Sequence, residues 1–150
     1  MGRADRVLKF ISLLKHSKAP FAGQPFRPME WQNEFIRKLY GTLGPDGKRQ
    51  YRQALLYLPR KNGKTFLAAA LALYHLVGDG KHGAEVYLAA GSRDQASICF
   101  NQARDFVRMN PTLSKRLRII DYKKEIHDDK TSSVLKALAS RIWAREKKKA

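Results

Sequence analysis

The stretch from Gln53 to Val77 constrains the fold of this chain more than any other. A short apolar run, QALLYL, breaks into the loop PRKNG and resumes as TFLAAALALYHLV, which is apolar on nearly every side. The first pattern is typical of a buried strand that opens into a loop, and the second of a helix packed against a sheet. We therefore predict a strand at Gln53–Leu58, a loop, and a buried helix that ends at Gly78 and Gly80.

The rest of the chain continues this alternation. EVYLAA (85–90) is a second apolar run, and Ser92 with Gln95 forms a capping box for a helix at Arg93–Met109. RLRII (116–120) is a third candidate strand, while EIHDD and SVLKALA are shorter candidates that could pair with the sheet or extend its edge. This order predicts an α/β fold, a parallel sheet flanked by helices. The helix at Arg93–Met109 is expected to bury Ala96, Cys99, Ala103, Phe106 and Val107.

Two helices are predicted before this pattern. The first lies in RVLKFISLLKH and is amphipathic, with Val7, Phe10, Ile11 and Leu14 on its apolar side. The stretch KAPFAGQPFRP holds three prolines and is an ordered connector. The second helix, MEWQNEFIRKLYG, ends at Gly41 and carries Trp31, Phe35, Leu39 and Tyr40 along one side.

Charge is the unusual part of the composition. Lys and Arg number 30 against 13 Asp and Glu, a formal net charge of +17 over 150 residues. Such a charge attracts polyanions, so nucleic acid is the first partner to consider.

With no apolar run of about 18 residues and no signal peptide, we expect a cytoplasmic protein with no membrane partner. The single cysteine, Cys99, is expected to be a small core residue, and His75 and His127 lack the spacing of a zinc site.

Gly63, Lys64 and Thr65 stand where the predicted strand gives way to the buried helix, which is the context of a phosphate-binding loop. Gly63 permits close backbone approach, Lys64 can reach the β and γ phosphates of ATP, and the Thr65 hydroxyl can ligate Mg²⁺. The first glycine of G-x-x-x-x-G-K-[ST] is missing, because Leu58 occupies its place. The alternative is a basic connection that binds nothing.

The rest of the loop can compensate for the missing glycine. Pro59 and the small Asn62 can shape another turn around the phosphates. Arg60 and Lys61 add charge where a triphosphate would lie, and a guanidinium near the γ phosphate can stabilise charge in the transition state. Both side chains could equally be plain electrostatic anchors. Arg60 and Lys64 are therefore the catalytic candidates, and the whole loop is a candidate nucleotide-binding site.

Three motifs resemble a known family in their order and spacing: FRPMEWQ (26–32), LPRKNGKT (58–65) and AAGSRDQA (89–96). Together they are similar to the large terminase subunit of tailed bacteriophages, the motor that packages DNA into proheads. In that family the Walker A loop often lacks its first glycine and carries a basic residue such as Arg60. The resemblance covers roughly residues 7–140, which would be the first half of the ATPase domain.

The resemblance also implies ligands and partners. Trp31 and Gln32 look like the adenine-recognition motif, with Gln32 hydrogen-bonding the base, although Trp31 could simply anchor its helix in the core. The implied cofactors are ATP and Mg²⁺. The implied partners are double-stranded DNA, the portal protein and the small terminase subunit, and a homo-oligomer is compatible with the family. The implied location is the host-cell cytoplasm, for a chain encoded by a phage or prophage.

The chain departs from the family's pattern after these motifs. A Walker B strand would be an apolar run ending in Asp-Glu, and no such run occurs. Asp128 and Asp129 lack that strand and are expected to form a polar turn. We expect no nuclease domain in this chain, because the family's cluster of metal-binding carboxylates is not evident in it. We expect an amphipathic helix within residues 1–20, a partial P-loop ATPase domain at 21–140 and a basic tail at 141–150, from a truncated, frameshifted or split reading frame.

Two functions therefore stand against each other. The chain is either the ATP-binding N-terminal portion of a packaging motor, or a truncated, non-catalytic nucleic-acid-binding module with a vestigial phosphate loop. Whether it is itself an enzyme stays open, because the Walker B acid is not evident. A P-loop helicase is a weaker third interpretation.

Overall fold

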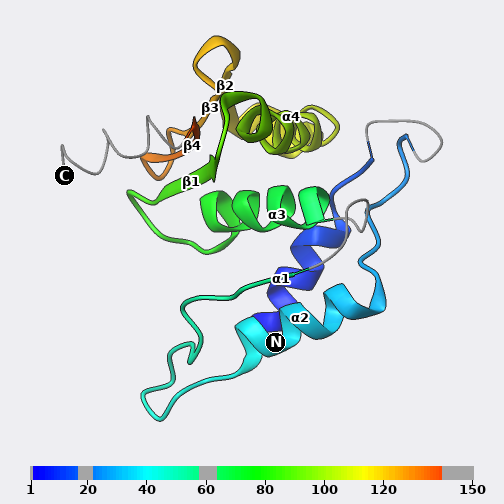
Figure 1. Ribbon diagram of the computed structural model, residues 1–150, viewed down its shortest axis with the longest axis vertical. Coiled ribbons are helices and arrows are strands. Elements are labelled where there is room, and N and C mark those ends of the chain that lie inside the picture. Colours follow the sequence, from blue (N-terminus) through cyan, green and yellow to red (C-terminus); the bar gives the residue numbers. More distant parts are fainter. Residues whose placement is uncertain (1, 17–21, 58–63, 140–150) are drawn as a thin grey trace.

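The computed structural model describes residues 2–16, 22–57 and 64–139 (Figure 1). Its α-helices are α1 (Arg3–Ser12), α2 (Glu30–Gly41), α3 (Lys64–Leu73), α4 (Arg93–Arg108) and α5 (Pro111–Arg116). A π-helical turn, η1 (Tyr74–Gly78), continues α3, and a 3-10 turn, η2 (Asp121–Lys123), connects two of the strands. The strands are β1 (Glu85–Ala90), β2 (Leu117–Ile120), β3 (Glu125–Asp128) and β4 (Ser133–Ala139). The predicted basic tail at 141–150 lies outside the described residues.

The four strands form one sheet in the order β1-β4-β3-β2. β1 and β4 are parallel, with Glu85 opposite Val134 and Ala90 opposite Ala139. β3 is antiparallel to both β4 and β2, because only short turns join these strands. α4 packs on β1 and β4. The predicted α/β fold is confirmed, but the sheet is mixed, and among the described residues only β1 and β4 pair in parallel.

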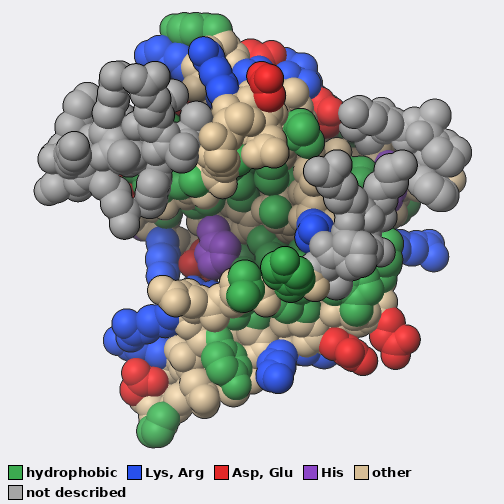
Figure 2. All heavy atoms as spheres, in the orientation of Figure 1, with side chains coloured by type: hydrophobic (Ala, Val, Ile, Leu, Met, Phe, Trp, Pro, Cys, Tyr) green, Lys and Arg blue, Asp and Glu red, His purple; other side chains and the backbone are tan. Residues whose placement is uncertain are grey.

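The predicted strand at Gln53–Leu58 is wrong for the residues that the structure describes. Gln53–Tyr57 forms no strand, and the side chains of Leu55 and Tyr57 are 89% and 93% exposed. Figure 2 shows hydrophobic side chains at the middle of this face, where the segment crosses in front of α1 in Figure 1. An apolar run becomes a strand only when a neighbouring strand accepts its backbone hydrogen bonds, and among the described residues β1 pairs with β4 alone.

The buried helix predicted after the loop is confirmed. α3 lies between the α1–α2 pair and α4, which explains why its sequence is apolar on nearly every side (Figure 1). The Phe66 ring lies 6.1 Å from that of Phe26 and 6.3 Å from that of Phe106, measured between centroids. The buried side chains of α3 itself are Leu67, Ala69, Ala70, Ala72 and Leu73. α3 is thus the centre of the hydrophobic core.

The two N-terminal helices follow the prediction, with one shift. α1 buries Val7 and Ile11, as expected. In α2 the fully buried side chains are Gln32, Ile36 and Tyr40, whereas Trp31, Phe35 and Leu39 are half-buried at the border of the core. The buried side of α2 therefore runs through Gln32, Ile36 and Tyr40, at i, i+4 and i+8. This is one residue along from the predicted side through Trp31, Phe35 and Leu39.

The boundaries of α4 and α5 have local causes. The Ser92 hydroxyl accepts a hydrogen bond from the Gln95 N–H at 3.2 Å, so the predicted N-cap is confirmed. α5 was not predicted. It begins at Pro111, and the Asn110 side chain caps it by accepting hydrogen bonds from the N–H groups of Thr112 and Leu113. Over the described residues, no helix is long and apolar enough to cross a membrane.

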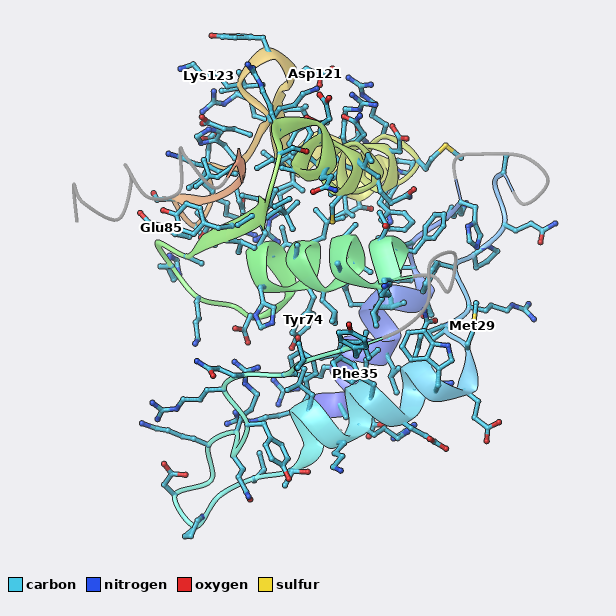
Figure 3. The ribbon with its side chains drawn as sticks, viewed as in Figure 1. Met29, Phe35, Tyr74, Glu85, Asp121 and Lys123 are labelled. Carbon is cyan, nitrogen blue, oxygen red and sulfur yellow. The ribbon has the colours of Figure 1, made fainter. Side chains whose placement is uncertain are left out.

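Gly78, the last residue of η1, lies close to the Tyr74 ring and leaves no room for a side chain. A Cβ atom placed there would lie 2.6 Å from Cδ2 of Tyr74, whose ring is held edge-on by Phe10 and Tyr40 at 5.8 and 6.0 Å (Figure 3). We expect Gly78→Ala to lower the free energy of unfolding by about 1–3 kcal/mol through overpacking. Urea unfolding measures the change.

Gly41→Ala is the matched control for Gly78→Ala. A Cβ at Gly41 would meet Ala4 at 3.5 Å, an ordinary contact, so this helical substitution should leave stability unchanged or raise it slightly. Equal losses of stability in the two variants would contradict the proposed contact with Tyr74.

Candidate nucleotide site at the start of α3

The predicted phosphate loop is described only at its last two residues. Lys64 and Thr65 form the first turn of α3, with Lys64 half-buried and Thr65 exposed. The other predicted site residues of the loop lie outside the described residues: Pro59, Arg60, Lys61, Asn62 and Gly63. No acidic residue occupies the first turn of α3. The unpaired N–H groups of a helix start favour an anion, and no side-chain carboxylate of this turn competes for them.

A cavity of about 360 Å³ lies beside this helix start. It is lined by Lys64, Thr65 and Ala68 from α3, by Tyr87–Ala90 from β1, and by Gln95, Ala96 and Cys99 from α4. The start of α3 therefore lies at the carboxyl end of β1, where ligands bind in open α/β sheets. The volume is within the range of small-molecule sites. The Lys64 ammonium and the helix start are hydrogen-bond donors that fit a phosphate, and the Thr65 hydroxyl oxygen can ligate its magnesium ion.

Cys99 borders this cavity without a catalytic arrangement. Its thiol points at the carbonyl oxygen of Thr65 at 3.9 Å, and burial raises the pKa of Cys99 to about 11. The thiol is therefore protonated at neutral pH and is a poor nucleophile. This agrees with the predicted packing role, although Cys99 is half-buried rather than fully enclosed.

Trp31 and Gln32 lie at the start of α2, on the same side of the view in Figure 1 as the start of α3. Gln32 is 1% exposed, and its amide oxygen accepts a hydrogen bond from the Met29 N–H at 2.8 Å. Gln32 thus caps α2. Because Met29 lacks the Ser or Thr of the usual capping-box pattern, the sequence held no clear signal for this cap. Trp31 packs against the core, as its alternative interpretation expected, and its contact with adenine stays a prediction.

Asp128 and Asp129 form the end of β3 and the turn after it. Asp128 is fully buried and accepts hydrogen bonds from Arg116 at 2.8 and 3.3 Å and from the Thr131 hydroxyl at 2.9 Å. Burial alone would raise the pKa of Asp128, but the bonds from Arg116 and Thr131 lower it below its ordinary value. Asp129 pairs with Arg118 at the surface. The predicted polar turn is confirmed for Asp129, whereas it is wrong for Asp128, which ends β3 and is buried against Arg116.

The topology separates these two acids from the candidate site. Asp128 is opposite Ser133, the first residue of β4, and β4 runs parallel to β1. Asp128 therefore lies at the amino end of that strand pair, whereas Lys64 lies at its carboxyl end. Neither acid is placed to activate water at α3. No group of three or more His, Cys, Asp or Glu side chains within the described residues could hold a metal ion.

One partly buried polar cluster had no signal in the sequence. The Tyr40 hydroxyl and His75 Nε2 lie 2.8 Å apart, and His75 Nδ1 lies 3.6 Å from a carboxylate oxygen of Asp79. Burial raises the pKa of Tyr40 to about 12 and lowers that of His75, so both side chains are neutral near pH 7. The cluster joins α2 to η1. Tyr40 is 35 residues from His75 in the chain, so only the fold brings it to the His75–Asp79 pair.

Comparison with known proteins decides the family. The family described as "Terminase large subunit, ATPase domain" matches residues 30–144, most of the chain. The chain belongs to this family. The large terminase subunit of Enterobacteria phage HK97 is 36% identical over 131 residues, which cover 84% of this chain and 24% of that protein. The resemblance carried by the three motifs is confirmed.

Solved structures agree with this membership. The crystal structure of the HK97 bacteriophage large terminase matches with a TM-score of 0.81 and 35% identity, over 93% of this chain and 28% of that one. This chain therefore spans about a quarter of the length of the terminases it matches. Its fold is that of a terminase ATPase domain, and the match favours this interpretation over a helicase or a non-catalytic module.

Proposed function

We propose that this chain binds ATP and Mg²⁺ at the start of α3, as the nucleotide-binding part of a motor that packages double-stranded DNA. The single observation that carries the proposal is the cavity where Lys64 and Thr65 meet the carboxyl end of β1. A helix start with no acidic side chain in its first turn, at that end of the sheet, suits a triphosphate.

The proposed roles follow from the donors of each residue. Lys64 holds the β and γ phosphates, and the Thr65 hydroxyl orients the metal ion. Gly63, Asn62 and Pro59 shape the turn around the phosphates. The metal ion, when bound, neutralises charge on the phosphate oxygens.

The remaining roles rest on the resemblance to terminases. Arg60 stabilises charge at the γ phosphate and Lys61 adds to the local positive potential. Trp31 and Gln32 receive the adenine. We further propose the portal protein and the small terminase subunit as partners, in the cytoplasm of the host cell. Hydrolysis needs a carboxylate to activate water, and neither Asp128 nor Asp129 is placed to supply it.

Calorimetric titration with ATP, with and without Mg²⁺, tests this proposal through Thr65. We expect Thr65→Val to weaken binding of the magnesium complex by about 10-fold, because it removes one metal ligand. It should leave metal-free ATP binding unchanged. Thr65 is exposed, so the swap should not disturb folding.

Thr65→Ser keeps the hydroxyl and is the matched control. It should bind the magnesium complex as the unmodified chain does. A folded chain that gives no heat with ATP would overturn the nucleotide role, and equal losses in Val and Ser variants would remove the metal role of Thr65.

A further inference from the structure

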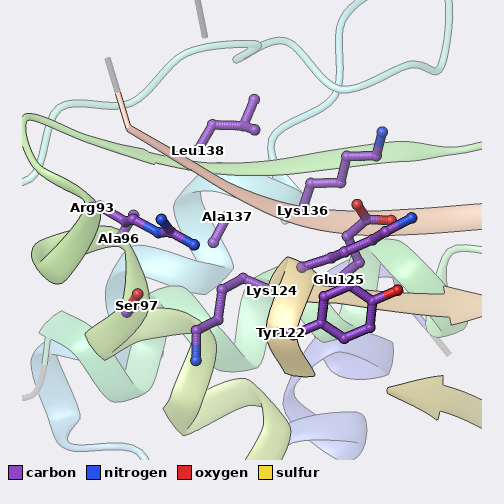
Figure 4. Close-up of a pocket in the computed structure, with 10 residues that line it drawn as sticks. Arg93, Ala96, Ser97, Tyr122, Lys124, Glu125, Lys136, Ala137 and Leu138 are labelled. Atoms are coloured by element: carbon purple, nitrogen blue, oxygen red, sulfur yellow. The ribbon is translucent and has the colours of Figure 1, made fainter. Parts of the chain in front are cut away.

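A second cavity, of about 260 Å³, lies on the other side of the first turns of α4 (Figure 4). Its walls come from three places: the start of α4, the connection between β2 and β3, and the end of β4. The charged and aromatic residues that line it are Arg93, Tyr122, Lys123, Lys124, Glu125 and Lys136. Four cations and one carboxylate therefore surround one small space, which is not explained by a nucleotide at α3.

The cations of this cavity are poorly compensated. Within the described part of the chain, Arg93, Lys123 and Lys136 form no ion pair, whereas Lys124 lies 3.5 Å from Asp121. The only carboxylate of the lining, Glu125, is 2.8 Å from His127 Nε2. The cavity therefore keeps a surplus of positive charge.

The nearest acid of the surrounding surface, Asp121, is already shared among several cations. Asp121 already lies 3.1 Å from Arg104 and 3.7 Å from Arg108, in addition to its contact with Lys124. Figure 2 shows Lys and Arg side chains gathered at the top of the molecule, over the connection between β2 and β3. Like charges held this close repel one another, and an anion bound between them removes that repulsion.

Tyr122 adds an exposed aromatic side chain to the rim. It is 78% exposed in η2, and the Lys123 ammonium lies 5.9 Å from the centroid of its ring. The labelled Lys123 and Asp121 in Figure 3 mark where this turn stands out from the sheet. Packing of the core does not require a tyrosine here. Its hydroxyl is a donor of the kind that contacts phosphates in protein–DNA interfaces.

We propose that this cavity and its rim bind the phosphodiester backbone of double-stranded DNA. Arg93, Lys123 and Lys136 contact successive phosphates, and Tyr122 hydrogen-bonds at the edge. Cations that lie on three separate elements and form no ion pair match the repeated charges of a polyanion better than they match one small anion. The net charge of +17 also attracts a polyanion to the protein surface. The inference rests on the proposed DNA partner but not on ATP binding.

Binding of a short DNA duplex at several salt concentrations tests this assignment. The variant Lys123→Gln/Lys136→Gln should bind about 10-fold more weakly at moderate salt, and its slope of log affinity against log salt should fall by about two. Tyr122→Phe should weaken binding without changing the slope. ATP titration of the same variants should be unaffected, which separates this site from the one at α3.

The matched control removes two exposed lysines elsewhere. Lys48→Gln/Lys130→Gln makes the same change in net charge, on the loop after α2 and the turn after β3, and should leave most of the affinity and slope intact. Equal losses in both double variants would show that charge alone attracts DNA and would overturn the site. Tighter binding of polyglutamate than of the duplex, lost in Lys123→Gln/Lys136→Gln, would instead assign the site to an acidic protein.

Discussion

Lys64→Ala is expected to weaken binding of the ATP–magnesium complex by about 10- to 100-fold. The estimate follows from losing charge-assisted hydrogen bonds to phosphate, each worth about 1.5–3 kcal/mol. Lys64 stands at the start of α3 and lines the cavity at the carboxyl end of β1, so its loss removes charge where the phosphates would lie. Calorimetric titration of the purified chain measures the change.

Lys130→Ala is the matched control for Lys64→Ala. It removes the same charge from an exposed turn after β3, at the amino end of the β1–β4 pair. Nucleotide binding should be unchanged in this control. If both variants lose affinity equally, general electrostatic attraction explains ATP binding and the α3 site is wrong. If neither does, the loop does not hold the phosphates.

Asp128→Ala is expected to cause the largest loss of stability. Removing one partner of a buried ion pair costs about 3–5 kcal/mol, and we expect about 2–4 kcal/mol because Arg116 is partly exposed to solvent. The substitution also leaves the Thr131 hydroxyl without the Asp128 carboxylate. Urea unfolding monitored by circular dichroism gives the change in the free energy of unfolding.

Asp129→Ala is the control at the neighbouring position. Both Asp129 and its partner Arg118 are exposed, so this loss should be much smaller. A change equal to that of Asp128→Ala would mean that the turn as a whole, rather than the buried pair, holds β3 and β4 together.

The contribution of Asp128 should depend on pH in a defined direction. Its pKa is lowered in the folded state, so the unfolded chain takes up the proton first as the pH falls. The stabilisation is complete above the unfolded pKa of about 4 and is lost as the pH falls through the lower folded value. The difference in stability between the unmodified chain and Asp128→Asn should therefore shrink below about pH 4. A constant difference down to acid unfolding would contradict the shifted pKa.

Much of the candidate site could be predicted from short stretches of sequence. The start of α3 follows from the apolar helical run that comes directly after Lys64, and the start of α4 follows from Ser92 three residues before Gln95. These signals are local, because a helix satisfies its own hydrogen bonds and its caps lie within one turn. The motifs around them were enough to indicate the terminase family.

Other features could not be predicted because their partners are distant in the chain. From the sequence, Asp128 is predicted to be a turn residue. Only the pairing of β2 with β3 brings Arg116 next to it. The cations at Arg93, Lys123 and Lys136 come from three elements and share one cavity only in the fold. Gln53–Tyr57 carries the apolar pattern of a strand, yet β1 takes its hydrogen bonds from β4.

The sequence by itself determined helices α1 to α4 and the family, since each depends on neighbours a few residues apart. Only the tertiary structure decided which strands pair, which acid is buried and where basic side chains converge. The physical reason is that strand pairing and buried charge need partners from elsewhere in the chain, and those partners are set by the whole fold.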